Sequence, residues 1–291
     1  MKEMFLDIGE LGWSFYLSAH MRWLKENGNV VPAVMVVPGR EALYKDIAPA
    51  IFQVPAEFHK DFSGRSQNCF VLYGVTGDRL RTYFNSRLPE NYVVSKSQPL
   101  DCSLYNKIYV GKKLYIPYVY ETKLKGKKEI LVFPRMRKAF PFKMRNLSEH
   151  FYISLIKRLC DENRDYTIRT MGTLSGAYSI TKEKVPENNY VNSVGETSSL
   201  QAVIDRCQVA ICTVGGTSAL PKLAMLQGVP SFIVGHEDAR FKVEENWRRT
   251  KVGFYHISHL QYGTFDFKNC IEEIISFIKE VCNEARSNQV D

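Results

Sequence analysis

The 291-residue sequence lacks several features that would place it in a common class of proteins. It has no apolar run that approaches the ~18–20 residues of a membrane-spanning helix. Its first residues do not form a signal peptide, because Glu3, Asp7 and Glu10 interrupt what would be the apolar core. We therefore expect no transmembrane segment, and a peripheral contact with a membrane stays open.

Cysteine is present but forms no recognisable framework. The seven cysteines are an odd number, and no two of them form a Cys-x-x-Cys pair. Cys160, Cys207 and Cys212 fall in apolar patterns, as buried free thiols do. The sequence therefore predicts no disulfide framework, no zinc site and a reducing, cytoplasmic location.

Positive charge is concentrated in one part of the chain. Residues 123–145 contain nine Lys or Arg residues and one acid, Glu129. The net charge of this segment is therefore +8, the same as that of the whole chain, and the remaining residues sum to about zero. Such a segment suits a local anionic ligand, such as a diphosphate, or an edge that faces a membrane. The alternative is a solvated basic loop, which we prefer for residues 123–128. The segment has no nucleic-acid-binding motif, so we expect no nucleic-acid partner.

Short apolar segments alternate with helical patterns along most of the chain, which is long enough for two domains. Strands or continuing elements are expected at residues 4–8, 30–37, 41–45, 51–54, 69–73, 77–84, 92–95, 129–133, 166–171, 190–194, 209–214, 229–234 and 253–257. Helices are expected at residues 13–26, 148–160, 198–206, 219–227 and 269–285. This alternation predicts an α/β fold with parallel sheets.

Residues 208–236, QVAICTVGGTSALPKLAMLQGVPSFIVGH, predict a strand, a glycine turn, a helix and a second strand. Gly215 and Gly216 are expected to end the first strand, and Thr217-Ser218 to supply the helix N-cap. Such a unit presents backbone N–H groups and a partial positive charge over the turn, which favours a phosphate. The alternative is that the two glycines only make a tight connection.

The same segment resembles a known family. Ser199-Leu200-Gln201, then Asp205, then AICTVGGTSALPKLAMLQGVP, are similar to the C-terminal half of GT-B glycosyltransferases. The heptosyltransferase-like and surface-polysaccharide branches are the most similar. The resemblance covers residues 129–252 and, more weakly, the first forty residues.

The resemblance implies two Rossmann-like domains whose parallel sheets face a cleft. An acceptor-side domain, with the interdomain region, would span residues 1–122. A nucleotide-sugar-binding domain would span residues 123–291, and its last helix often packs back towards the first domain in this family.

For the donor, the resemblance implies a helix N-terminus that faces the diphosphate. Arginines that follow the strand at residues 129–133 would add planar, permanently charged groups suited to phosphate oxygens. A position just after the strand at residues 229–234 often touches the donor in this family. The expected donor-binding residues are Arg135, Arg137, Arg145, Gly215, Gly216, Thr217, Ser218 and Glu237.

A sugar transfer with inversion also needs a base that takes the proton of the acceptor hydroxyl. Glu10 is the first candidate, because it follows the first strand on a glycine loop that faces the cleft in this family. Its alternative role is to cap the helix that follows. Asp7 and His236 are the further catalytic candidates, although Asp7 lies nearer the strand interior, as structural residues do.

The stereochemistry follows from a departure from the family. Retaining GT-B enzymes place paired glutamates before the equivalent of Gly228-Val229-Pro230, where this chain has Gly-Thr and Lys-Leu. The pair Glu237 and Glu245 lies after it, which favours an inverting enzyme. The sequence has no Asp-x-Asp pair, so we expect a metal-independent reaction with no cofactor.

The leading hypothesis is therefore a glycosyltransferase that moves a sugar from a nucleotide-sugar donor to a hydroxyl of an oligosaccharide or glycan acceptor. One alternative is a nucleotide-sugar epimerase or hydrolase of the same fold, which would need additional carboxylates and histidines. Another is a non-catalytic sugar-binding module, which would show no donor hydrolysis.

Overall fold

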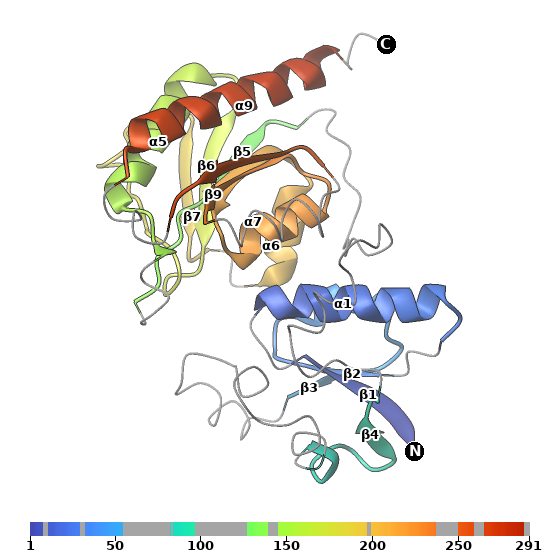
Figure 1. Ribbon diagram of the computed structural model, residues 1–291. Helices are drawn as coiled ribbons and strands as arrows, with labels where there is room; N and C mark the ends of the chain where they lie inside the picture. Colours follow the sequence, from blue (N-terminus) through green and yellow to red (C-terminus); the bar gives the residue numbers. More distant parts are fainter. Residues whose placement is uncertain are drawn as a thin grey trace. The chain divides into compact units, whose positions relative to one another are not determined.

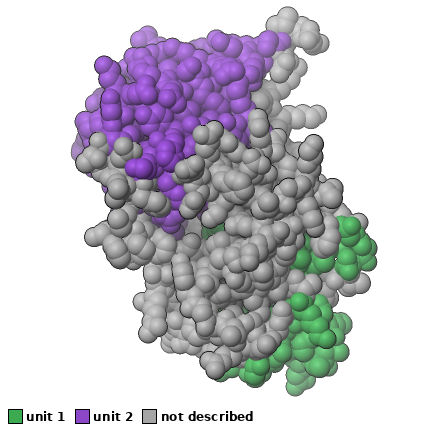
Figure 2. All heavy atoms as spheres, in the orientation of Figure 1, with its two compact units in different colours: residues 1–117 green, residues 118–291 purple. Residues whose placement is uncertain are grey.

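The chain forms two compact units, Met1–Pro117 and Tyr118–Asp291 (Figure 2). The computed structural model describes residues 1–7, 11–29, 33–54, 82, 84–96, 127–138, 145–196, 199–236, 250–258 and 265–287. Within these residues, no helix is both long enough and apolar enough to cross a bilayer.

The first unit contains a parallel sheet with the strand order β3-β2-β1-β4. Its described elements are β1 (Lys2–Asp7), α1 (Leu11–Glu26), β2 (Val34–Val36), the 3₁₀ helix η1 (Glu41–Leu43), β3 (Ile51–Gln53) and β4 (Tyr92–Val94). Met4 and Leu6 alternate along β1 and pack with Met35 and Phe84 in one core. The alternation follows from the two-residue period of a strand, which directs every second side chain to the same face.

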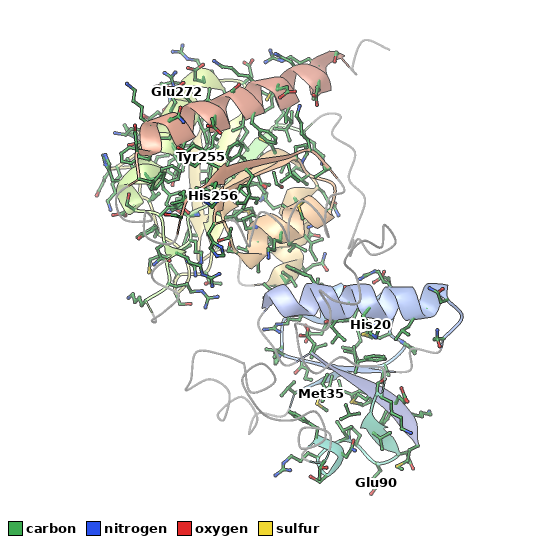
Figure 3. All side chains as sticks on the ribbon, in the orientation of Figure 1. His20, Met35, Glu90, Tyr255, His256 and Glu272 are labelled. Carbon is green, nitrogen blue, oxygen red and sulfur yellow. The ribbon has the colours of Figure 1, made fainter. Side chains whose placement is uncertain are left out.

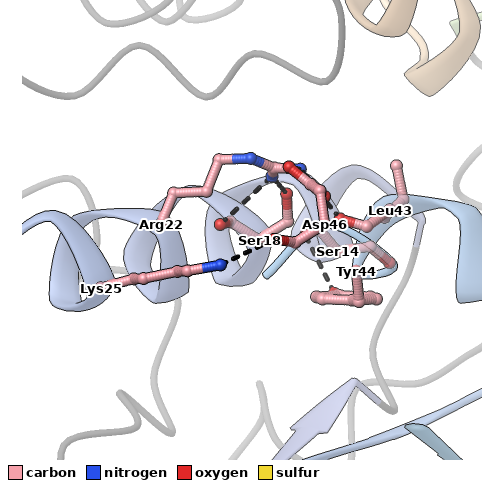
Figure 4. Close-up of polar contacts among 7 residues, drawn as sticks. All are labelled: Ser14, Ser18, Arg22, Lys25, Leu43, Tyr44 and Asp46. Atoms are coloured by element: carbon pink, nitrogen blue, oxygen red, sulfur yellow. Dashed lines mark hydrogen bonds and ion pairs between the residues drawn. The ribbon is translucent and has the colours of Figure 1, made fainter. Parts of the chain in front are cut away.

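A set of polar contacts holds the segment after β2 against α1 (Figure 4). The Arg22 guanidinium donates to both carboxylate oxygens of Asp46, at 2.8 and 3.0 Å, and to the carbonyl of Leu43 at 3.2 Å. Lys25 Nζ donates to the Asp46 carbonyl at 2.8 Å, and Arg22 also contacts Ser18. Because Arg22 is buried, these contacts compensate for the loss of its hydration.

The second unit contains a six-stranded parallel sheet with the strand order β10-β9-β8-β5-β6-β7. The strands are β5 (Glu129–Phe133), β6 (Thr167–Gly172), β7 (Tyr190–Val194), β8 (Ala210–Gly216), β9 (Ser231–Gly235) and β10 (Val252–His256). All pairs in this sheet are parallel. The predicted α/β class with two parallel sheets is confirmed.

Helices cover both faces of this sheet (Figure 1). On one face α5 (Glu149–Glu162) and α9 (Phe267–Ser287) pack against each other, and on the other α6 (Leu200–Cys207) contacts α7 (Ala219–Leu226). The apolar face of α9 accounts for its place, since each large buried side chain contributes about 1.5–3 kcal/mol. The buried residues of α9 are Cys270, Ile271, Ile274, Ile275, Phe277, Ile278, Val281, Cys282 and Ala285.

Three expectations about element boundaries were wrong. Residues 41–45 contain a 3₁₀ helix, and the second strand of the first unit is limited to Val34–Val36. Gly215 and Gly216 do not end β8 but are its last two residues. Glycines usually weaken a strand, so this pair needs a packing reason, which lies at the functional site.

Lys127 lies two residues before β5 and is only 7% exposed. Among the described residues its Nζ has no hydrogen-bond partner. Burial lowers the pKa of its ammonium group from 10.5 to about 8, against a weaker opposing effect of the nearby Cys207. The folded protein therefore holds a proton on this group at a cost in stability below pH 8.

We expect Lys127→Met to stabilise the protein by about 2 kcal/mol at pH 7, because it removes this cost. The advantage should shrink as the pH rises from about 8 towards 10.5, where the unfolded lysine keeps its proton and the folded one releases it. Urea unfolding of both proteins at pH 7 and pH 10 measures the difference. A difference that does not change with pH would contradict a buried ammonium as its source.

Candidate functional site

The strand order of the second unit places a switch point between β5 and β8. β6 and β7 extend to one side of β5, and β8, β9 and β10 extend to the other. In open α/β sheets, ligands bind outside the carboxyl ends of the strands at such a point. Phe133 pairs with Gly215, so the residues that follow these two strands leave the sheet side by side. The switch point therefore brings the loop of Arg135 to the turn of Thr217.

At this turn the N-terminus of α7 is left without a side-chain cap. Ser218 occupies the N-cap position with an extended backbone, but its side chain makes no capping hydrogen bond. By contrast, Ser148 accepts from Phe151 at the start of α5, and Ser199 accepts from Ala202 at the start of α6. The half-buried Ser218 hydroxyl has no hydrogen-bond partner within the described part of the chain.

Four backbone N–H groups lie at the same turn. The N–H of Thr217 donates to the Val234 carbonyl at 3.2 Å, which uses it within the fold. The N–H groups of Ser218, Ala219 and Leu220 have no hydrogen-bond partner among the described residues. The first turn also contains no acidic residue, so the partial positive charge of the helix end is not compensated there. This arrangement is suited to an anion.

Close packing explains the two glycines of β8. A Cβ atom on Gly215 would lie 2.6 Å from Pro221 Cγ and 3.1 Å from Phe133 Cβ, so only glycine lets α7 approach the sheet here. A Cβ atom on Gly216 would have no neighbour nearer than 3.8 Å. The first glycine is therefore needed for packing, and the second is not.

Thr217 is held in the same way by the neighbouring strand. A Cβ atom on Gly235, the last residue of β9, would lie 2.1 Å from Thr217 Cγ2. Thr217 is 8% exposed, and its Oγ1 is buried without a hydrogen-bond partner in the part of the chain that the structure describes. The turn is thus fixed from β9 as well as from β8.

Arg135 follows β5 on a loop that is tied to a second loop. Tyr178 N–H donates to the Pro134 carbonyl and Met136 N–H to the Gly176 carbonyl, both at 2.8 Å. Arg135 is 8% exposed, and its guanidinium donates to Asn146 Oδ1 at 2.8 Å. Its side chain is therefore fixed and mostly withdrawn from solvent.

The other predicted arginines are placed differently. Arg137 is exposed, and its main chain is held by the Asn146 side chain. Arg145 is half-buried and begins the lead-in to α5. Arg135 is the most buried of the three arginines, so its charge would interact most strongly with a bound anion.

Asp7, at the end of β1, accepts hydrogen bonds from three side chains of the first unit. It is 2% exposed, and its Oδ1 accepts from Ser14 Oγ at 2.9 Å and from Arg40 at 3.1 Å. Its Oδ2 accepts from the Tyr44 hydroxyl at 2.9 Å. These three donors join β1, α1 and the segment after β2, which is a structural role.

The remaining candidates lie at strand ends or outside the described residues. His236 directly follows β9 and is half-buried. His256, labelled in Figure 3, ends β10 on the same edge and is exposed; its backbone pairs with Gly235. Glu10 and Glu237 lie outside the described residues.

Thiol and metal chemistry receive no support from the described residues. The five described cysteines are buried and free, and burial raises the pKa of Cys160 and Cys207 to about 12, so both remain protonated at neutral pH. No group of three or more His, Cys, Asp and Glu side chains among the described residues could hold a metal ion.

Asn146 is the residue at this site that sequence reasoning missed. It lies in the lead-in to α5, and its side chain makes three hydrogen bonds to the loop after β5. The only signal in the sequence is its place two residues before the N-cap Ser148, which gives no indication of these contacts.

The sequence matches no protein-family model and no curated protein. Solved structures are similar to it over nearly their whole length. ADP-heptose lps heptosyltransferase II of E. coli is 15% identical with a TM-score of 0.63, over 96% of this chain and 99% of that chain. A glycosyl transferase family 9 protein of Veillonella parvula is 8% identical with a TM-score of 0.62, over 96% and 97%. The E. coli heptosyltransferase WaaC with ADP is 10% identical with a TM-score of 0.58, over 97% and 100%.

These similarities confirm the predicted heptosyltransferase-like GT-B fold. At 8–15% identity they establish a shared arrangement of strands and helices, whereas an activity must be argued from the residues of the site.

Proposed function

We propose that this chain is a glycosyltransferase that moves a sugar from a nucleotide-sugar donor to a hydroxyl of a glycan acceptor. The observation that carries the proposal is the uncapped N-terminus of α7 at the switch point of the sheet, where β5, the strand that leads into Arg135, ends beside β8. Two similar solved structures support it: one is a heptosyltransferase with ADP, and the other is a heptosyltransferase with ADP-2-deoxy-2-fluoro heptose.

The donor's diphosphate would lie over the turn at residues 215–218. The N–H groups of Ser218, Ala219 and Leu220 would donate to phosphate oxygens, with the Ser218 hydroxyl as a further donor. The Arg135 guanidinium would compensate the negative charge that develops on the diphosphate as its bond to the sugar breaks. These groups stabilise the transition state more than the ground state, because the charge on the leaving group grows during the reaction.

The acceptor would be activated by a carboxylate of the first unit. In the proposed inverting reaction, Glu10 takes the proton of the acceptor hydroxyl while the oxygen of that hydroxyl forms a bond to the anomeric carbon of the sugar. The bond from that carbon to the diphosphate oxygen breaks in the same step, and the electron pair leaves with the diphosphate. His236 is the second candidate base. We propose no metal ion or cofactor, because the backbone donors and Arg135 would carry out the charge compensation.

Two further points belong to the proposal. The buried free thiols support a reducing compartment such as the cytosol. Glu237 and Arg137 stay donor-binding candidates, and Arg145 joins them through its place beside Asn146.

The first test is a thermal-shift screen with UDP, GDP, ADP, CMP and dTDP. A nucleotide at ~100 times its dissociation constant adds about 2.7 kcal/mol to the free energy of unfolding, which the melting temperature reports. The best nucleotide then selects the sugar donors for a transfer assay. Binding with neither transfer nor donor hydrolysis would indicate a sugar-binding module.

Arg135→Ala should weaken binding of the selected nucleotide by roughly 1.5–3 kcal/mol, the range of a charge-assisted hydrogen bond. This corresponds to about 10–150-fold in the dissociation constant, which isothermal titration calorimetry measures. The free nucleoside is the control ligand and should bind both proteins equally. An equal loss for the nucleoside would show that Arg135 does not contact phosphate.

A further inference from the structure

The Asn146 side chain connects the lead-in to α5 with the loop that follows β5. Its Oδ1 accepts from the Arg135 guanidinium at 2.8 Å and from the Arg137 N–H at 3.0 Å, and its Nδ2 donates to the Arg137 carbonyl at 2.8 Å. One side chain thus fixes the backbone of the loop after β5 and the charged group that this loop carries. The bonds to Arg137 close a ring with its main chain, which leaves the amide with a single orientation.

The chemical type of this residue matters as much as its place. A neutral amide oxygen orients the guanidinium and adds no negative charge beside it. A carboxylate at the same place would accept the same two hydrogen bonds but would form an ion pair with Arg135, which lowers the attraction of a phosphate. It would also place a negative oxygen against the Arg137 carbonyl.

We propose that Asn146 is a positioning residue for the donor's phosphates and acts through Arg135. The inference rests on the proposed function, since it names how the diphosphate site of that function is held. Arg135 leaves β5 beside the turn of Thr217, so a guanidinium held by Asn146 would meet the same anion as the N-terminus of α7. Without Asn146, the guanidinium would lose the hydrogen bond at 2.8 Å, and the ligand would have to supply that part of its ordering, at a cost in conformational entropy.

A double-mutant cycle separates this role from a general loss of structure. The proteins are the wild type, Arg135→Ala, Asn146→Ala and the double variant, and the probe is inorganic pyrophosphate, which carries the diphosphate without base or sugar. We expect Asn146→Ala to raise the dissociation constant about 5–10-fold and Arg135→Ala to raise it about 10–150-fold. The double variant should bind no more weakly than Arg135→Ala alone, because Asn146 has no effect without the arginine.

Two control variants complete the experiment. Asn163→Ala removes a buried asparagine at the other end of α5, whose Nδ2 donates to the Leu159 carbonyl at 3.0 Å. It should lower the melting temperature and leave pyrophosphate affinity unchanged. Asn146→Asp should keep most of the melting temperature yet bind pyrophosphate at least as weakly as Asn146→Ala, with a difference that decreases at high salt.

The outcomes distinguish the inference from the function on which it rests. If Arg135→Ala weakens binding and Asn146→Ala does not, or if the two effects multiply in the double variant, the positioning role is overturned and the proposed function remains. If wild-type protein binds neither pyrophosphate nor any of the five nucleotides, both are overturned.

Discussion

Replacing Glu10 by glutamine should lower the turnover of sugar transfer by about 10²–10⁴-fold, the usual contribution of a general base. Glutamine has nearly the shape of glutamate but cannot accept the acceptor's proton. Donor affinity should stay nearly unchanged, because the diphosphate would bind to the second unit. Steady-state transfer rates with the selected donor, together with nucleotide titrations, measure both quantities on one variant.

The matched control is Asp7→Asn, which changes the neighbouring carboxylate of the same strand end. Asp7 accepts hydrogen bonds from Ser14, Arg40 and Tyr44, so its loss should lower the melting temperature and leave turnover of the folded protein largely intact. Unchanged turnover of Glu10→Gln with a lowered melting temperature would identify Glu10 as a helix cap. His236 would then be the next residue to test.

The fold was predictable to a large extent because its signals are local. The apolar runs that became β5 and β7 have the predicted bounds, and the helical spacing of isoleucines predicted α9. Predictions were least accurate where tertiary contacts decide a boundary. A pair of glycines normally interrupts a strand, but β8 continues through it, because Gly215 and Gly216 pair with Ile233 and Val234 of β9.

The candidate site was predictable in part for the same reason. A strand, a small turn and a helix in sequence indicate an anion site, and this led to the turn at residues 215–218. The roles of Asp7 and Asn146 could not be predicted, because each depends on partners distant in the sequence: Arg40 and Tyr44 for the first, Arg135 for the second. Hydrogen bonds across a fold have no periodic signal in the sequence.

Gly215 and Gly216 are equivalent in the sequence, yet the structure predicts opposite results for their replacement. Gly215→Ala should destabilise the protein by about 3 kcal/mol, because the added Cβ would clash with Pro221 and Phe133, and neither side chain has room to move away. Its Cβ would lie 2.6 Å from the ring of Pro221 in α7 and 3.1 Å from the Cβ of Phe133 in β5. Any relief requires α7 to move away from the sheet, and its N-terminal N–H groups would move with it.

We therefore expect Gly215→Ala to lose binding as well as stability. Urea unfolding gives the first quantity, and titration with the selected nucleotide below the melting temperature gives the second. Gly216→Ala is the matched control, because its Cβ would meet no atom nearer than 3.8 Å. It should change both quantities little. If Gly215→Ala loses stability and keeps full affinity for the nucleotide, the N-terminus of α7 does not hold the phosphates, and the donor must bind elsewhere along the carboxyl edge of the sheet.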